Sequence, residues 1–443
     1  MFTCVLVANR GEIAVRVIRA LHELGIEAVA VYSTADRDAQ HVTLADRAVC
    51  IGPPSPAESY LNIASVIGAA ETTGCQAVHP GYGFLAERPA FVTACTENDL
   101  VFIGPHAEVM ARMGDKIEAK AAMRAAGVPL VPGTQGATTL AQAQKLAPEI
   151  GFPVLLKAAA GGGGRGMRLV VSPDELEPAF STASAEAEAA FGDGSLYLEK
   201  ALVPARHVEI QVLADNHGGV LTLGERECSI QRRHQKLIEE SPSPALTPET
   251  REAMEASAEQ ACRETGYTNA GTLEFLLGGD GAFYFIELNA RLQVEHPVTE
   301  LVTGIDIVRE QLRIAAGEAL GTTGRAARSG HAIEIRINAE DPANGFAPSP
   351  GRIERMQFPG GPGVRVDTHV SRGTTIPPNY DSLIGKLIVW DADRPAAIAR
   401  GLRALGELEI EGIATTRDFA RNVLESEAFT SGDYTTSYLD EHS

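Results

Sequence analysis

The chain has 443 residues, of which 44% are hydrophobic and 22% charged, a composition typical of a folded, soluble protein with two or three domains. The formal net charge of −20 argues against nucleic acid or an anionic membrane as a partner, and no apolar run is long enough to span a bilayer. The N-terminus has no signal-peptide pattern and the six cysteines show no paired metal-ligand spacing, so we expect a cytoplasmic protein with reduced thiols.

The first hundred residues alternate short apolar runs with helical periodicity. A helix with Ile13 and Val17 on its apolar face follows the first run, and Gly25 ends it. Apolar runs that predict strands occur at residues 4–8, 28–32, 77–79 and 100–103. The alternation predicts βαβ units, and hence a parallel-sheet domain over residues 1–103.

The remainder of the chain divides into a linker and two further domains. Residues 104–130 predict a helical linker, and residues 131–201 predict a small domain that we expect to move. Its expected elements are strands at 153–158, 167–171 and 196–199 and a helix at 179–190. From residue 202 to residue 443 the pattern predicts a mainly antiparallel sheet. The expected fold class is therefore α/β, with an α+β C-terminal part.

A glycine-rich run lies between two expected strands of the small domain, at Gly161, Gly162, Gly163, Gly164 and Gly166. Its exposed N–H groups can cover a polyphosphate. The run matches the dinucleotide pattern G-x-G-x-x-G, but that fingerprint requires a helix next, and a strand is expected instead. No Lys-Ser or Lys-Thr follows, which argues against a Walker-type loop. A phosphate-covering loop and a disordered hairpin tip both remain open.

Residues 271–289 predict a hairpin with one glutamate in each strand. Glu274 and Glu287 interrupt otherwise apolar strands, and Asn289 lies on the same strand face as Glu287. Because an unpaired buried carboxylate is costly, each glutamate requires a cation or a hydrogen-bond donor. Two carboxylates and an amide oxygen suit Mg²⁺ held between ATP phosphates, whereas salt bridges to arginine are the alternative.

Two other segments are dense in polar residues. Beyond the hairpin, Arg291 can bind a planar oxyanion and Glu295, if desolvated, can act as a general base; a solvated turn is the alternative. Residues 225–236 are too polar for a packed strand and predict a surface loop, in which we expect Cys228 to have a packing role. Only seven lysines occur in the chain, and four lie in the motif-bearing segments: Lys116, Lys157, Lys200 and Lys236.

Five long motifs, in order along essentially the whole chain, resemble those of biotin carboxylase. They are ANRGEIA at 8–14, HPGYGFL at 79–85, the glycine run, residues 225–236, and ELNARLQVEHPVTE at 287–300. The resemblance implies an ATP-grasp fold with an N-terminal domain, a small lid that closes over ATP and a C-terminal domain. These three parts agree with the boundaries expected above.

The resemblance also implies roles for individual residues. Positions that match the ATP pocket are Lys116, Lys157, Gly162, Gly163, Gly164, Met167, Glu199, Lys200, Leu202, His207, Gln231, His234 and Leu276. Positions that match the metal site are Glu274, Glu287 and Asn289, and those that match the bicarbonate pocket are Lys236, Arg291, Gln293 and Val294. Glu295 matches the base that deprotonates bicarbonate, and Arg336 and Tyr82 match the biotin site. The implied catalytic set is Glu295, Arg291, Arg336 and Lys236.

The implied activity is the ATP-dependent carboxylation of biotin by bicarbonate, through carboxyphosphate, as the first half-reaction of an acetyl-CoA or acyl-CoA carboxylase of fatty acid biosynthesis. It implies Mg²⁺, with Mn²⁺ as an alternative metal. No lysine is flanked by methionines as in a biotin attachment site, so we expect carrier-bound biotin, with a biotin carboxyl carrier protein and carboxyltransferase subunits as partners.

A homodimer is also expected, because Arg19, Glu23 and Arg365 resemble dimer-face positions, although Pro362 stands where an aromatic residue is common. Two other functions remain open. One is a different ATP-grasp carboxylate ligase, which the bicarbonate and biotin motifs disfavour. The other is a non-catalytic nucleotide-binding subunit, which the retention of Glu295 and Arg336 disfavours.

Overall fold

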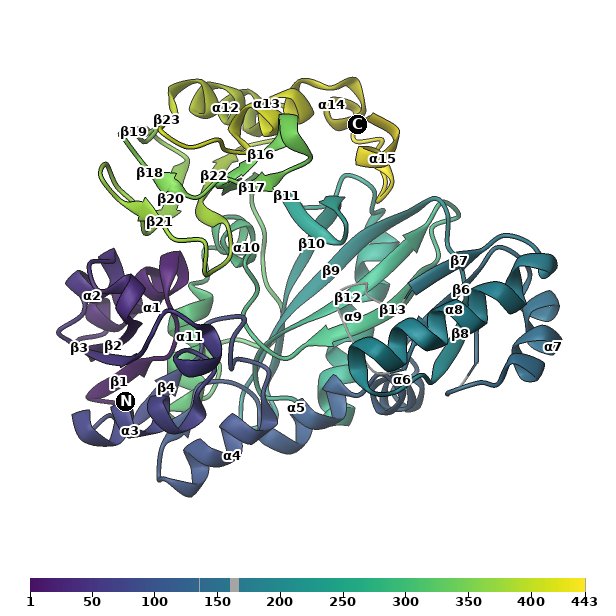
Figure 1. Ribbon diagram of the computed structural model, residues 1–443, viewed down its shortest axis with the longest axis horizontal. Helices are drawn as coiled ribbons and strands as arrows, with labels where there is room; N and C mark the ends of the chain where they lie inside the picture. Colours follow the sequence, from purple (N-terminus) through teal and green to yellow (C-terminus); the bar gives the residue numbers. More distant parts are fainter. Residues whose placement is uncertain (135, 160–166, 443) are drawn as a thin grey trace.

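The computed structural model describes residues 1–134, 136–159 and 167–442, and the expected phosphate-covering glycines lie outside these residues. Four parts follow one another along the chain (Figure 1). The N-terminal domain leads through helices along one side of the molecule to the small lid, and the chain then builds a large sheet and a C-terminal layer. The predicted α/β class, with its α+β C-terminal part, is confirmed.

Domain one is a five-stranded parallel sheet in the order β3-β2-β1-β4-β5, as the βαβ pattern predicts. Gly25 follows α1 with a positive φ of 72°, as expected for a helix stop. Strand β3 was not predicted, although it contains the apolar run Ala48 to Ile51; five of its six residues are exposed or half-exposed at the sheet edge. The elements are β1 (Cys4–Val7), α1 (Gly11–Glu23), β2 (Glu27–Ser33), η1 (Thr34–Asp36), α2 (Gln40–Leu44), β3 (Arg47–Gly52), η2 (Pro56–Glu58), α3 (Ile63–Thr73), β4 (Ala77–His79), α4 (Pro89–Glu97) and β5 (Val101–Phe102).

The predicted linker forms two helices, α5 (Ala107–Gly114) and α6 (Lys116–Ala125), whose buried methionines share a core with domain one and the large sheet. The lid then has a three-stranded antiparallel sheet in the order β7-β6-β8, against which two helices pack (Figure 1). Its elements are α7 (Leu140–Ile150), β6 (Val154–Ala158), β7 (Met167–Val170), α8 (Pro173–Phe191) and β8 (Leu196–Lys200). The lid has small apolar clusters of its own, so its packing is separate from the larger cores.

The largest sheet has nine strands, in the order β13-β12-β9-β10-β11-β15-β22-β20 with β14 beside β10. Its pairs are antiparallel, as predicted, except for β10 with β14. The expected hairpin is formed by β12 and β13. The strands and helices of this part are β9 (Ala205–Ala214), β10 (Val220–Arg232), β11 (Gln235–Ser241), α9 (Pro248–Thr265), β12 (Asn269–Gly278), β13 (Phe283–Asn289), α10 (His296–Thr303), α11 (Ile307–Ala315), β14 (Gly324–Arg325), β15 (His331–Asn338), β20 (Val364–Thr368) and β22 (Leu383–Asp391).

The prediction of a surface loop at residues 225–236 is wrong. Residues Glu225 to Arg232 continue β10, at the centre of the large sheet, and Glu225, Arg226 and Glu227 are fully buried. The strand tolerates these charges because its neighbours neutralise them; for example, Arg251 and Arg328 pair with Glu225 at 2.8 and 3.0 Å. The exposed residues of this segment are Arg233, His234 and Gln235, at the tight turn that follows the strand.

The C-terminal layer completes the fold. It contains β16 (Glu340–Asp341), η3 (Pro342–Asn344), β17 (Ala347–Pro348), β18 (Gly351–Arg352), β19 (Arg355–Gln357), β21 (Thr375–Ile376), α12 (Arg394–Glu407), β23 (Glu409–Glu411), α13 (Arg417–Glu425), α14 (Glu427–Ser431) and α15 (Tyr438–His442). An apolar cluster joins α12 and α13 to β15 and β22, which fixes the position of Arg336 on β15. Among the residues described above, none of the helices is long and apolar enough to cross a bilayer.

Candidate active site

A cleft of 1220 Å³ is lined by domain one, the lid, the large sheet and the C-terminal layer. Of the predicted site residues that the structure describes, all except Lys200 contribute to its lining. They are Tyr82, Lys116, Lys157, Met167, Glu199, Leu202, His207, Gln231, His234, Lys236, Glu274, Leu276, Glu287, Asn289, Arg291, Gln293, Val294, Glu295 and Arg336. Residues predicted from motifs far apart in the chain therefore meet in one cavity.

Glu295 lies between two cations in this cleft. Its Oε1 is 2.6 Å from Lys236 Nζ, and its Oε2 is 3.0 Å from Arg336 Nη2. The carboxylate is almost fully buried, with 1% of its side chain exposed. Burial by itself raises the pKa of Glu295, but the charges of Lys236 and Arg336 outweigh burial and hold that pKa well below its usual range. Glu295 is therefore an ionised carboxylate at neutral pH.

Arg336 has a second carboxylate partner that sequence reasoning missed. Its Nε donates to Glu239 Oε1 at 2.6 Å. Burial, together with the nearby charge of Glu295, raises the pKa of Glu239 to about 7, although Arg336 opposes the rise. Glu239 and Arg336 lie on neighbouring strands of the large sheet, β11 and β15, so their contact depends on strand pairing that local sequence does not specify.

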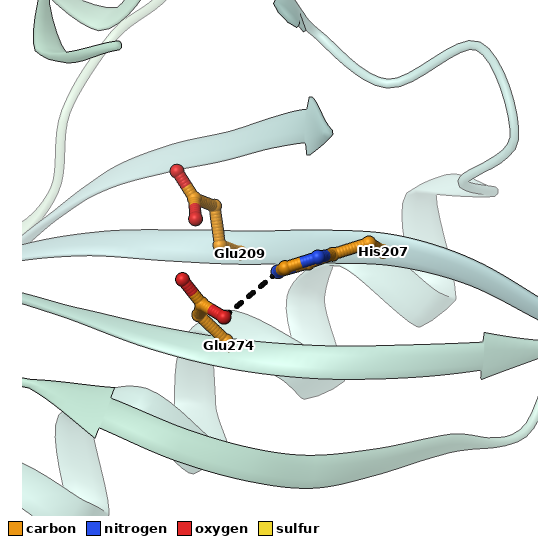
Figure 2. Close-up of side chains that lie close together, drawn as sticks. All are labelled: His207, Glu209 and Glu274. Atoms are coloured by element: carbon orange, nitrogen blue, oxygen red, sulfur yellow. Dashed lines mark ion pairs between the residues drawn. The ribbon is translucent and has the colours of Figure 1, made fainter. Parts of the chain in front are cut away.

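Lys236 is surrounded by three carboxylates. Besides Glu295, its ammonium contacts Glu209 Oε2 at 2.6 Å and Glu274 Oε1 at 3.0 Å. Figure 2 shows Glu209 and His207 on one strand and Glu274 on the next, with His207 Nε2 3.0 Å from Glu274 Oε2. These three side chains are close enough to hold a metal ion, but Lys236 already supplies a positive charge to both carboxylates. A cation at this point would compete with the lysine.

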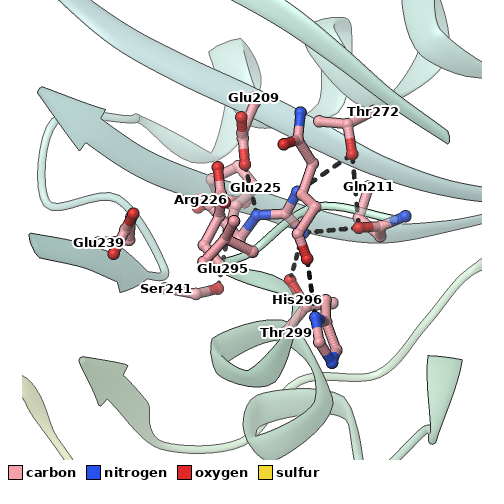
Figure 3. A network of polar contacts seen from close by, with 12 residues as sticks. Glu209, Gln211, Glu225, Arg226, Glu239, Ser241, Thr272, Glu295, His296 and Thr299 are labelled. Carbon is pink, nitrogen blue, oxygen red and sulfur yellow. Dashed lines mark hydrogen bonds and ion pairs between the residues drawn. The ribbon is translucent and has the colours of Figure 1, made fainter. Parts of the chain in front are cut away.

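Arg226 supports this group of charges and is wholly buried. Figure 3 shows the polar side chains that it contacts. It donates to Glu209 Oε1 at 2.5 Å, to Gln211 Oε1 at 2.7 Å, and to the hydroxyls of Thr272 and Thr299 at 3.1 and 3.0 Å. The guanidinium thus has both a counter-charge and neutral acceptors, which offsets the cost of its burial. Glu209 is consequently shared by Arg226 and Lys236.

The predicted metal ligands Glu274 and Glu287 face each other across the hairpin, as register partners on β12 and β13. Asn289 Nδ2 donates to Glu274 Oε1 at 2.9 Å. Burial raises the pKa of Glu287, and the charge of Glu274 raises it further. In the described part of the chain no hydrogen bond or ion pair to the carboxylate of Glu287 is found. Two facing carboxylates, one of them uncompensated, fit a divalent cation, and the salt bridges to arginine that were the alternative are not formed by the described residues.

Arg291 is held by side chains from two parts of the molecule. Its Nε donates to Glu87 Oε2 at 2.8 Å, and its terminal nitrogens donate to Gln293 Oε1 at 2.8 Å and Asn289 Oδ1 at 2.9 Å. Glu87 follows β4 in domain one and also accepts from the N–H of Ala290 at 2.9 Å. The cation is therefore fixed at the junction between domain one and the large sheet, with its planar face oriented by three acceptors.

Three lysines and one glutamate gather where the linker meets the lid. Lys157 Nζ lies 2.6 Å from Glu199 Oε2, and Lys120 forms an ion pair with the other oxygen of Glu199. Burial lowers the pKa of Lys116 and of Lys120, which is the expected effect on cations with too few anions around them. Lys120 was missed, although it lies four residues after Lys116 and so shares a face of α6 with it.

Apolar side chains and a tight turn complete this end of the cleft. Met167, Leu202 and Leu276 line it from the lid, the connecting segment and β12. In the turn between β10 and β11, Arg233 and His234 have φ angles of 48° and 66°, a left-handed conformation that is unfavourable for both side chains. This strained turn holds His234 and Lys236 on the cleft wall.

Lys200 is oriented differently from the other predicted residues. Its ammonium donates to the carbonyl oxygens of Gly151 and Phe152 at 2.8 and 3.0 Å, within the lid. Cys228, by contrast, behaves as predicted: its thiol is fully buried, and burial raises its pKa well above the ordinary value, which fits a packing role.

The fold and the cleft together define the class of protein, a nucleotide-dependent ligase of the ATP-grasp fold. Three family descriptions match consecutive parts of the chain: "Biotin carboxylase, N-terminal domain" at residues 1–110, "Carbamoyl-phosphate synthase L chain, ATP binding domain" at 115–323, and "Biotin carboxylase C-terminal domain" at 334–441. The chain therefore belongs to the biotin carboxylase family, which confirms the predicted family, fold and enzyme class.

Individual proteins resemble the chain over its full length. A biotin carboxylase of Nostoc sp. is 55% identical over 99% of both chains. A biotin carboxylase of Campylobacter jejuni, solved as a β-γ-ATP complex, has a TM-score of 0.97 and 49% identity, with 100% of this chain and 99% of that one covered. The biotin carboxylase domain dimer of Hydrogenobacter thermophilus 2-oxoglutarate carboxylase, solved with MgADP, ADP and bicarbonate, has a TM-score of 0.95 and 51% identity, with coverage of 100% and 98%.

Proposed function

We propose that the chain carboxylates biotin with bicarbonate, using ATP and Mg²⁺ and releasing ADP and phosphate. The observation that carries the proposal is the buried, ionised Glu295 between Lys236 and Arg336, in the same cleft as the lysine cluster of the linker and lid. Membership in the biotin carboxylase family and the MgADP and bicarbonate complex of the Hydrogenobacter relative support it.

Bicarbonate binds beside Lys236 and Arg291, with Gln293 and Val294 completing the pocket. Glu295 removes the bicarbonate proton, so that an oxygen of the anion attacks the γ-phosphate of ATP. Its low pKa in the free protein keeps it unprotonated at neutral pH. When an anion binds beside Lys236, repulsion between like charges raises the proton affinity of Glu295, which makes it a stronger base in the complex.

ATP lies between the linker, the lid and the large sheet, with Lys116 and Lys157 near its phosphates. Met167, Leu202 and Leu276 supply the apolar walls for its base, and His207, Gln231 and His234 border the pocket. Glu199 holds Lys157 in place, and Lys120 joins the cluster. Because the ammonium of Lys200 is already bound to two carbonyl groups, its contact with ATP comes from the main chain.

Glu274, Glu287 and Asn289 would hold Mg²⁺, with Mn²⁺ as an alternative. A bound divalent cation neutralises phosphate charge during phosphoryl transfer. His207 and Lys236 orient Glu274 within this site. Closure of the lid would exclude water from the reactive acyl phosphate.

Biotin accepts the carboxyl group next to Tyr82 and Arg336. Carboxyphosphate breaks down to CO₂ and phosphate, and the phosphate removes the N1′ proton of biotin. Arg336 then stabilises the negative charge on the enolate oxygen of biotin. To do so, the guanidinium must interact with the substrate as well as with the carboxylates of Glu239 and Glu295.

The proposed biotin is bound to a biotin carboxyl carrier protein, and carboxyltransferase subunits use the product. We also propose a homodimer through Arg19, Glu23 and Arg365, which the domain dimer of the Hydrogenobacter relative supports. Domain limits at 1–103, 131–201 and 202–443, with a linker at 104–130, are consistent with the separate lid clusters. The cytoplasmic location stays a prediction.

The test is ADP release with MgATP and bicarbonate, measured with and without free biotin, with Glu295→Ala as the control. We expect stimulation by biotin in the parent and none in the variant. Absence of stimulation by free biotin and by carrier-bound biotin would contradict the proposal. If another carboxylic acid then stimulated ADP release, the chain would be a different ATP-grasp ligase, and ATP binding without turnover would make it a regulatory subunit.

A further inference from the structure

Two cysteine thiols lie side by side in domain one. Cys4 begins β1 and Cys75 stands two residues before β4; they are 71 residues apart in the chain, but their Sγ atoms are 3.3 Å apart. The pairing of β1 with β4, in which Val5 is opposite Ala77, brings them together. The sulfur atoms are about 1.3 Å farther apart than in a disulfide of about 2.0 Å, a gap that side-chain rotation can close.

The two thiols have different surroundings. Arg47 Nη2 lies 3.4 Å from Cys4 Sγ and also donates to the carbonyl of Thr73 at 2.9 Å, while 43% of the Arg47 side chain is exposed. Burial raises the pKa of the Cys75 thiol to about 12. Cys4 therefore sits beside a partly exposed cation, whereas Cys75 keeps its proton. Cys4 and Cys75 are 5% and 7% exposed, so only a small reagent reaches them.

We propose that Cys4 and Cys75 are a modification site that forms a reversible disulfide with a small hydroperoxide. The Cys4 thiolate attacks one oxygen of hydrogen peroxide, the O–O bond breaks, and the departing hydroxide takes up the proton that Cys4 released. The sulfur of Cys75 then attacks the resulting Cys4 sulfenic acid. The S–O bond breaks, and the second hydroxide leaves with the Cys75 proton as water. Two thiols lose two electrons, and the peroxide is reduced to two waters.

The position of this site predicts its effect. The disulfide ties two neighbouring strands at their amino ends and closes a long loop of the unfolded chain, which stabilises the folded state. The cleft, by contrast, is lined by residues that follow the carboxyl ends of the same strands, Asn9 to Ile13 after β1 and Tyr82 to Phe84 after β4. Oxidation should therefore raise the melting temperature and leave the turnover number nearly unchanged.

Peptide mapping of the full chain tests the proposal. Cleavage after arginine, lysine and glutamate separates residues 1–10 from residues 72–87, and each of these peptides contains a single cysteine. After treatment with hydrogen peroxide and alkylation under denaturing conditions, we expect the two peptides to be joined, with a mass about 2 Da below their sum, and to separate on reduction. The melting temperature should rise by several degrees and return on reduction.

Cys4→Ser and Cys75→Ala should each abolish the joined peptide and the stabilisation by peroxide. The matched control is Cys50→Ser, which removes an exposed thiol of the same domain and should leave both unchanged. Free thiols at Cys4 and Cys75 under conditions that oxidise Cys50 would overturn the proposal. Joined peptides without any rise in melting temperature would overturn the stabilising role.

Discussion

Replacing Lys386 by methionine removes a buried positive charge from the junction between domain one and the loop of residues 290–295. Lys386 lies on β22 with no exposed surface. Its ammonium donates to the carbonyl of Val294 at 2.8 Å and lies 3.3 Å from Glu12 Oε1, which also accepts from the hydroxyl of Tyr82. Methionine has a similar length, so the substitution tests charge and hydrogen bonding and leaves little cavity.

The expected loss of stability comes from the buried Glu12 carboxylate, which loses its counter-charge when the Lys386 ammonium is removed. Removing one partner of a buried ion pair costs about 3–5 kcal/mol, because the other charge stays desolvated. Glu12 can avoid part of this cost by taking up a proton. Burial raises the pKa of Glu12 above its ordinary value of 4.5, and at present Lys386 opposes that rise. Without the lysine, the pKa of Glu12 in the folded protein becomes higher still.

The raised pKa of Glu12 sets the sign of the pH dependence of the variant's stability. Below the pKa that Glu12 has in the unfolded chain, Glu12 is protonated in both the folded and the unfolded state. At such pH values this group adds little to the destabilisation of the variant. As the pH rises toward the raised folded pKa, the unfolded chain releases its proton while the folded chain retains it, so unfolding becomes more favourable. The difference in stability between variant and parent should therefore be larger at neutral than at acidic pH.

Urea unfolding at about pH 5 and about pH 8, read by circular dichroism, measures this difference. Because the carbonyl of Val294 loses its hydrogen bond from Lys386, we also expect KM for bicarbonate to rise while KM for ATP changes little. Lys145→Met, on the exposed face of lid helix α7, is the matched control. A destabilisation below about 1 kcal/mol, or one that is equal at both pH values, would refute the reasoning.

Three further substitutions probe the cleft. Glu295→Gln keeps the shape of the side chain but cannot accept a proton, so bicarbonate-dependent ADP release should fall by about 10²–10⁴-fold, while calorimetry should find ATP binding retained. Arg226→Met leaves Glu209 with one cation and should cost about 3–5 kcal/mol in chemical denaturation; a loss under 1 kcal/mol would mean that Lys236 alone suffices. Glu287→Gln should shift the Mg²⁺ titration of ATP cleavage to higher concentrations, and an unchanged titration would argue against its role as a ligand.

Much of the fold could be predicted because it is encoded in short-range patterns. The first strand and the first helix of domain one follow from an apolar periodicity that ends at Gly25. The hairpin of Glu274 and Glu287 follows from two apolar runs joined by glycines. The gathering of site residues in one cleft was inferred from the resemblance, since no local pattern brings the ends of distant strands together.

The errors arise where charges compensate across the fold. Residues 225–232 have the polarity of a loop, and they form a central strand because arginines from α9 and from the segment after β14 neutralise Glu225. Glu87 and Lys386 were missed for the same reason, since their charged partners Arg291 and Glu12 are distant in sequence. Local composition cannot identify a buried charge whose counter-charge comes from another element.

The arrangement of these compensating charges explains how one lysine can serve both structure and substrate. If Lys236 turns toward a bound bicarbonate, Glu209 still has Arg226 at 2.5 Å and Glu274 still has His207 at 3.0 Å. Glu295 retains Arg336 but loses the closer of its two cations. Of the three carboxylates around Lys236, Glu295 is the one that we propose lies next to the bound anion, and on that proposal its proton affinity rises most when bicarbonate is present. In the proposed mechanism, substrate binding itself would thus convert a stable carboxylate into the general base.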